Sequence, residues 1–188
     1  MARRPLRRER PAAVPTADGP VPGSQVRLAG PSDIGTVIEL RHLMFEAMGT
    51  PAEQLLDPGW RSEATRWLQL HLEDPRTAVV VATAGGAVVS CAMGQVVDLM
   101  PSPVRRGDAG GLLTNVATFP SHRRLGLSEA CVQAVIGWFR ECTAVEVVTL
   151  NATEEGSAMY ERLGFEVSTF PEMRCRLDRS AAPEEDDA

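Results

Sequence analysis

A short basic turn carries the clearest chemistry in this sequence. Its residues, Ser121 to Gly126, read SHRRLG and include Arg123 and Arg124. The turn leads into a helix, and the first N–H groups of a helix have no partner within it and lie at the positive end of its dipole. Gly126 has no Cβ, so a ligand can approach the backbone closely there. Together with two guanidinium groups, these features predict a site for a phosphate or a pyrophosphate.

The turn must be positioned by the elements on either side of it. Leu112–Thr118 is apolar and rich enough in β-branched residues to predict a buried strand, which should end near Pro120. From Leu127 to Trp138 the apolar residues recur at helical spacing. The segment therefore predicts a strand, a phosphate-binding turn and a helix in succession.

The rest of the chain predicts a mixed sheet. Before the turn we expect a strand at Gln25–Ala29, a helix from Pro31 to Gly49, a helical region from Pro51 to Leu72 broken near Pro58, and strands at Thr77–Thr83 and Ala87–Leu99. After it we expect a strand at Val145–Asn151, a helix at Glu154–Leu163 and closing strands at Phe165–Phe170 and Glu172–Leu177. Hairpins with one strand–helix–strand crossover predict an α+β fold, in which a mixed, mostly antiparallel sheet has helices on both faces.

Length and composition limit the organisation and the partners. The 188 residues predict one domain, at 25–178, between a disordered Arg- and Pro-rich tail at 1–24 and an acidic disordered tail at 179–188. The net charge of −6 argues against sequence-independent nucleic-acid binding, although an arm formed by the first tail stays an alternative. No apolar run suits a membrane span or a signal peptide, so we expect a cytoplasmic protein. Four scattered cysteines have no metal-ligand spacing and predict no metal site.

Two motifs resemble those of a known family. Pro120, Arg123, Gly126 and Ser128 resemble the acetyl-CoA-binding motif of the GNAT superfamily of N-acetyltransferases, with Ser128 where a glycine or alanine is usual. The run Tyr160–Phe165, YERLGF, resembles the second GNAT motif, after the strand that follows the cofactor helix. The resemblance covers about residues 25–177 and implies the GNAT fold, in which the central parallel strands splay apart.

The resemblance also implies a mechanism with acetyl-CoA as co-substrate and a primary amine as attacking group. The turn would hold the pyrophosphate through Arg123, Arg124, Leu125, Gly126, Leu127 and Ser128. Free backbone groups where the two parallel strands separate would bind the pantetheine arm and polarise the thioester carbonyl. These are the groups of Val116, Ala117 and Thr118, with Asn151 at the end of the second strand.

The sequence offers one candidate for the general acid and several for the general base. Tyr160, the single tyrosine, is our candidate general acid for the departing CoA thiolate, and simple packing beside the cofactor is the alternative. The candidate bases are Glu46, Asp98 and Glu146, and a chain of water molecules would replace all three. We expect His122 to be exposed or to contact phosphate, and Asn115 to bond across the cleft or to terminate packing.

The acceptor is left open between a small-molecule amine and a peptide amine. The first two helical regions and the loop 101–111 should border it, and Trp60, Trp67 and Leu68 would form either core or a substrate wall. Arg105 and Arg106 would meet an anion or lie in a solvated loop. A homodimer, another acyl-CoA donor, an oxygen acceptor and a non-catalytic module that binds acyl-CoA are the remaining alternatives.

Overall fold

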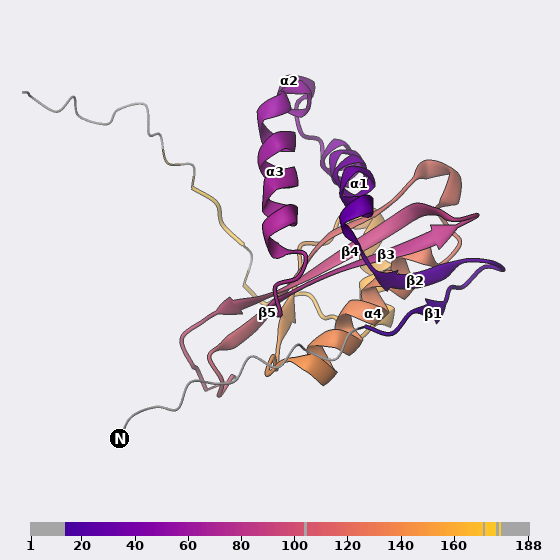
Figure 1. Cartoon of the computed structure of the whole chain (residues 1–188). Coiled ribbons are helices and arrows are strands. Elements are labelled where there is room, and N and C mark those ends of the chain that lie inside the picture. The colour runs from indigo at the N-terminus through magenta and orange to yellow at the C-terminus, as the bar shows by residue number, and fades with distance from the viewer. Residues whose placement is uncertain (1–13, 104, 171, 176, 178–188) are drawn as a thin grey trace, which may run out of the picture.

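The fold is a single twisted sheet between two layers of helices (Figure 1). The computed structural model describes residues 14–103, 105–170, 172–175 and 177. Within them the sheet has the order β1-β2-β3-β4-β5-β6, antiparallel except for the parallel pair β5–β6. The strands are β1 (Ala17–Asp18), β2 (Gln25–Leu28), β3 (Thr77–Ala84), β4 (Ala87–Asp98), β5 (Ala109–Thr118) and β6 (Val148–Thr149).

Helices cover both faces of the sheet, as the sequence predicts. One face carries α1 (Ile34–Ala47) and α3 (Pro58–His71), and the short helix α2 (Ala52–Leu56) lies in the connection between them. The other face carries α4 (Leu127–Cys142), and Tyr160 of α5 (Glu154–Arg162) packs into the same core. Successive side chains of β3 enter opposite cores, Val79 that of α1 and Val80 that of α4. This double burial explains why β3 reads as one continuous apolar run.

Several predicted boundaries agree with the structure. The break at Pro58 separates α2 from α3, and Asp57 caps α3 by accepting the N–H of Gly59 at 2.8 Å. The β3–β4 hairpin turns at Gly85 and Gly86, both with positive φ. The helices α4 and α5 also lie where the spacing of apolar residues predicts them.

Other predictions need correction. Among the described residues of 165–177 no strand forms, and Val167, Phe170 and Met173 are exposed. The predicted closing strands are wrong for this part of the chain because β6, at two residues, offers them almost no edge to pair with. The strand predicted at Val145–Asn151 shrinks to β6 for the same lack of pairing, while β5 begins at Ala109, inside the predicted loop.

The N-terminal prediction is also corrected in part. Ala17–Asp18 pair with Val26 and Gln25 as β1, so the predicted disorder is wrong for that strand. Residues 1–13 of the first predicted tail and all of the second lie outside the described residues.

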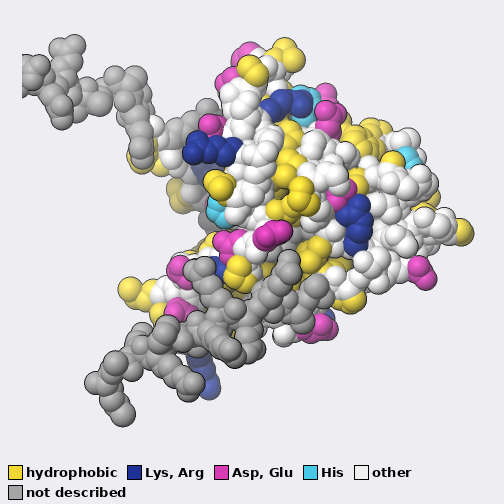
Figure 2. All heavy atoms as spheres, viewed as in Figure 1, with side chains coloured by type: hydrophobic (Ala, Val, Ile, Leu, Met, Phe, Trp, Pro, Cys, Tyr) yellow, Lys and Arg dark blue, Asp and Glu magenta, His cyan; other side chains and the backbone are white. Residues whose placement is uncertain are grey.

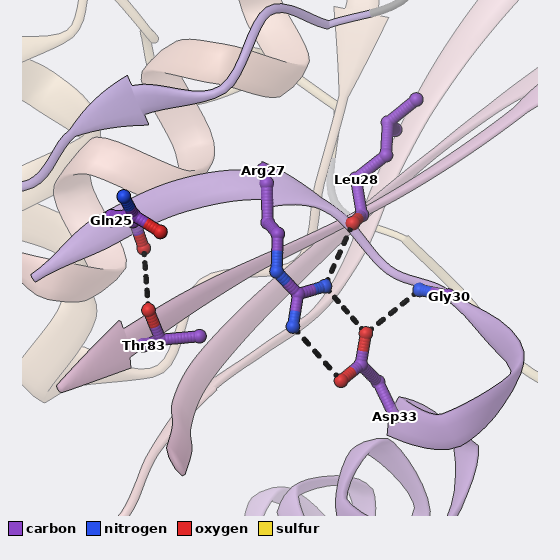
Figure 3. Close-up of polar contacts among 6 residues, drawn as sticks. All are labelled: Gln25, Arg27, Leu28, Gly30, Asp33 and Thr83. Carbon is purple, nitrogen blue, oxygen red and sulfur yellow. Dashed lines mark hydrogen bonds and ion pairs between the residues drawn. The ribbon is translucent and has the colours of Figure 1, made fainter. Parts of the chain in front are cut away.

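A partly buried ion pair secures the start of α1 (Figure 3). The Asp33 carboxylate accepts two bonds from Arg27 of β2, at 2.6 and 3.0 Å, and the N–H of Gly30 at 2.7 Å. Arg27 donates as well to the carbonyl of Leu28. Asp33 is only 7% exposed, and its bond with Arg27 holds the pKa of its carboxyl below the usual value. The cluster ties α1 to the sheet, and α1 packs over β5.

Asp33→Ala should lower the free energy of unfolding by about 1–3 kcal/mol, because Gly30 and Arg27 lose their acceptor. A pKa that is lower in the folded state stabilises the protein above the unfolded value of about 3.9, and this contribution is lost as pH falls through the folded value. Urea unfolding at a series of pH values measures both effects. The exposed pair Arg76–Asp98 gives the control: Asp98→Ala should change stability much less, and equal losses would contradict the assignment.

Candidate active site

The site lies where β5 and β6 stop pairing. β6 pairs only with Gly111 and Leu112, whereas β5 continues to Thr118, so six residues of its edge have no strand beside them in the described part of the chain. Phe119 donates its N–H to Val89, toward β4. Because N–H groups alternate in direction along a strand, those of Val116 and Thr118 point to the open edge. The prediction that the parallel strands splay is confirmed here.

A β-bulge at Asn115 sets this direction. The β4–β5 register shifts between Cys91 and Met93, and Asn115 has φ of 53°, a left-handed conformation that asparagine tolerates better than most residues. Its side chain is 2% exposed, and its carbonyl accepts the Cys91 thiol at 3.2 Å. Asn115 is thus a buried structural residue that turns the following backbone toward the open edge.

The predicted phosphate turn has backbone conformations suited to an anion. Arg124 and Gly126 both have positive φ, 63° and 77°, with Arg123 extended before them. Such alternation brings successive N–H groups together into a concave anion-binding surface. Among the described residues no side chain caps α4, so the N–H groups of its first turn are open to a ligand.

These features line one cavity of about 540 Å³. Nine residues predicted for the site belong to its lining: Val116, Ala117, Thr118, Arg123, Arg124, Gly126, Leu127, Ser128 and Tyr160. Leu125 and Asn151 do not: Leu125 faces solvent, and Asn151 is exposed and hydrogen-bonds Glu172. The structure therefore gathers the open edge, the turn and the tyrosine at one place.

Polar contacts order the rim of this cavity. Arg123 donates its Nε–H to the carbonyl of Thr118 at 3.3 Å, which ties the turn to the end of β5. The Thr153 hydroxyl caps α5 by accepting the N–H of Gly156 at 3.3 Å, so Thr153 serves the helix as well as the lining. Arg162 of α5 pairs with Glu129 of α4 at 2.8 Å. The two helices are thereby held on either side of the cavity.

Tyr160 is the one predicted catalytic side chain in the lining. It is 9% exposed and meets Phe165 edge to face, with 5.9 Å between ring centroids. Burial raises its pKa to about 12. The phenol therefore keeps its proton throughout the neutral range, as a general acid requires.

None of the three candidate bases belongs to the lining of either cavity described for this protein. Asp98 is an exposed partner of Arg76, at 2.6 Å. Glu146 accepts the backbone N–H of Arg106 at 3.2 Å. Glu46 is exposed on α1 beside the lining residues Met44 and Ala47. The predicted alternative that remains for the amine proton is therefore a chain of water molecules.

A second cavity, of about 270 Å³, lies between the α1–α3 layer and the sheet. Its lining is mainly apolar, with Trp67 and Leu68 of α3, but includes the side chains of Arg41, Gln95 and Asn115. Trp67 thus forms a cavity wall, whereas Trp60 packs against His42 and Phe45.

Sequence reasoning missed part of both linings. It did not identify Leu43, Met44 and Ala47, which border the larger cavity from α1, nor Arg41 in the smaller one. The one available signal was an arginine within the apolar stripe of α1, at LRHLMF. For His122 the sequence left exposure and phosphate contact open, and the structure places His122 in the lining of the larger cavity. Arg105 instead donates to the carbonyl of Met100, and neither Arg105 nor Arg106 lines a cavity.

Comparison with known proteins agrees with this geometry. The model of the acetyltransferase (GNAT) family matches residues 39–165. A GCN5-related N-acetyltransferase from Ralstonia eutropha is similar in structure, with 27% identity, a TM-score of 0.72, and coverage of 81% of this chain and 99% of that one. A predicted acetyltransferase from Clostridium acetobutylicum, solved with acetyl-CoA, has 20% identity, a TM-score of 0.70, and coverage of 80% and 96%. No curated protein matches the sequence.

The fold and the open-edged site define a GNAT fold, and the predicted fold class is confirmed. The family match spans more than half of the chain, so the chain belongs to the GNAT acetyltransferase family, whose members are acyltransferases that use acetyl-CoA. None of the helices in the described residues combines the length and apolar character that a membrane crossing needs.

Tyr160 should ionise with a midpoint near pH 12 in the folded protein and near 10 after unfolding. As the only tyrosine in the chain, it alone produces the tyrosinate absorbance, so a spectrophotometric titration reads it directly. Because the folded pKa is the higher one, the stabilising effect is complete below about pH 10 and is lost as pH rises toward 12. The same titration in denaturant is the control, and equal midpoints would show that the ring is solvated.

Proposed function

We propose that this protein transfers the acetyl group of acetyl-CoA to a primary amine by direct attack of the amine on the thioester. The observation that carries the proposal is that one cavity contains the free edge of β5, the uncapped start of α4 and the buried phenol of Tyr160. Acetyl-CoA presents an amide-bearing arm, a pyrophosphate and a sulfur leaving group. Each of these has a chemically suited partner in the lining.

The backbone of β5 would bind the arm. The N–H groups of Val116 and Thr118 point to the open edge, and an extended chain of amides can add there as a further strand. The turn that follows would receive the pyrophosphate, since Arg123, Arg124 and the first N–H groups of α4 converge on the same cavity. Gly126 would supply the left-handed backbone conformation, with φ of 77°, that this turn requires.

The same strand end would stabilise charge during transfer. When the amine nitrogen bonds to the carbonyl carbon, the carbonyl oxygen gains negative charge. A fixed N–H such as that of Val116 stabilises this oxyanion without reorganisation, because the bulge at Asn115 already orients it. Much of the remaining rate would come from holding the amine and the thioester together.

Tyr160 would complete the reaction. As the carbon–sulfur bond breaks, the electron pair stays on sulfur and the phenol supplies the proton, giving CoA and the acetylated amine. The amine proton would leave to water, because none of Glu46, Asp98 and Glu146 lines either cavity. The acceptor in this proposal is a small-molecule or peptide amine, and the setting is the cytoplasm.

Acetyl-CoA should raise the thermal unfolding temperature of the wild-type protein, since a ligand at about 100 times its Kd adds about 2.7 kcal/mol. Gly126→Ala should weaken this response, because an alanine is strained at φ of 77° and its Cβ would contact Pro20, so the turn would shift. Gly137→Ala is the matched control: it lies in α4 with no atom near the added Cβ, so it should keep the full response. No response in the wild type would refute the cofactor site.

Tyr160→Phe should lower kcat by about 100-fold or more while the thermal response to acetyl-CoA persists, because only the proton donor is removed. Release of free CoA with a panel of amines measures turnover. Glu161→Gln, at an exposed neighbour on α5 outside the lining, should behave like the wild type. Unchanged kcat in Tyr160→Phe would remove the assigned acid. Binding of acetyl-CoA without turnover of any amine would favour a non-catalytic module.

A further inference from the structure

The smaller cavity has a charged group at an unusual position. Arg41 belongs to α1 and lines the cavity between the α1–α3 layer and the sheet, and its side chain is half-buried. Hydrophobic side chains gather between α1 and α3 on the face seen in Figure 2. Arg41 lines the cavity together with Gln95 and Asn115, whose side chains are amides.

Arg41 has no anionic partner among the residues that the structure describes. Its Nη1 donates to the Asn115 side-chain oxygen at 3.3 Å, and its guanidinium lies 4.8 Å from the ring centroid of Phe45. Burial lowers its pKa, with no carboxylate to offset the effect. A guanidinium offers five N–H donors in a planar fork, so most of its donors are left for a ligand.

Arg27 shows how the same chain treats a structural arginine. Arg27 is held by Asp33 through two hydrogen bonds, which balance its charge and fix its plane (Figure 3). Partly burying a cation without such a partner costs free energy. An anionic ligand in the cavity would give Arg41 the charge partner that Asp33 gives to Arg27, and would thereby offset the cost of burying its charge.

The remaining lining residues of the cavity indicate the chemistry of the rest of that ligand. Ile38, Leu68 and Met93 are apolar, and Trp67 is held flat against His71 with ring centroids 4.2 Å apart. A rigid tryptophan next to a polarizable methionine suits an apolar or aromatic group. Among the described residues no carboxylate lines this smaller cavity, so its lining offers nothing that would attract a cationic group.

The cavity also adjoins the proposed transfer site. Asn115 lines the smaller cavity, and Val116, the next residue of β5, lines the larger one. A ligand held at Arg41 by its acid group can therefore extend toward the end of β5, where the thioester would lie. A small amine carrying a carboxylate meets both requirements.

We infer that the acceptor is an amino-acid-like molecule, whose carboxylate binds Arg41 in a bidentate manner and whose apolar side chain packs against Trp67. This inference rests on the proposed function and names its substrate class. The carboxylate would accept two parallel N–H bonds from the guanidinium, with Gln95 and Asn115 as further polar contacts. The amino group would then face the strand end.

The test compares acceptors that differ only in the acid group: phenylalanine, phenylalaninamide and phenethylamine, with leucine and methionine and their amides. CoA release in the wild type should favour the acids, with kcat/KM at least about 10-fold above that of the amides. Arg41→Gln should lower kcat/KM for the acids by about 10- to 100-fold and leave the amides nearly unchanged. Arg41→Lys should restore part of the loss. Arg66→Gln, an exposed arginine on α3, is the control and should resemble the wild type.

Binding keeps the outcomes distinct. In the presence of CoA, phenylalanine should raise the unfolding temperature of the wild type and not that of Arg41→Gln, whereas acetyl-CoA alone should stabilise both proteins equally. A wild type that prefers the amides, or an Arg41→Gln variant that loses acids and amides alike, would overturn the inference while leaving acetyl transfer intact. The inference also fails if the acids give neither turnover nor stabilisation. Loss of the acetyl-CoA response in the wild type would instead refute the proposed function.

Discussion

The bulge at Asn115 is the constraint on which both cavities depend. By adding a residue to β5 it reverses which N–H groups face β4, so those of Val116 and Thr118 turn to the edge that β6 leaves open. The side chain of Asn115 lies on the face of the sheet that α1 covers, where its amide oxygen accepts an N–H from Arg41. A left-handed asparagine held by Cys91 is a local strain that the surrounding core must over-determine. One irregular residue thus links the proposed thioester site to the proposed acceptor site.

Much of this arrangement could be predicted from local signals. The turn before α4 is specified by a proline, two arginines and a glycine within seven residues, 120–126, and its neighbours have clear strand and helix periods. Tyr160 could be identified from its short motif, and its burial follows from the apolar spacing of α5. These features arise from residues close in sequence, so pattern and structure agree at β5, the turn and α4.

The rest depends on long-range pairing that a single sequence does not encode in a readable way. The apolar positions of 165–177 fit a strand pattern, yet a strand requires an edge, and β6 ends after two residues. Asn151 fails as a lining residue for a related reason: beyond β6 its side chain turns to Glu172. Arg41 was missed because a charged residue in a helical stripe usually reaches solvent, and only the packing of α1 over β5 shows that it reaches a cavity.

Two glycines in the sheet explain how closely α4 packs on it. A Cβ on Gly94 would lie 2.6 Å from Val135, and one on Gly111 would lie 3.1 Å from Phe139. Both glycines therefore let α4 settle directly on β4 and β5, closer than any larger residue would permit. The height of the helix above the sheet fixes the position of its first turn relative to the end of β5. Close packing along α4 thus positions the backbone groups at its first turn, where we propose that the pyrophosphate binds.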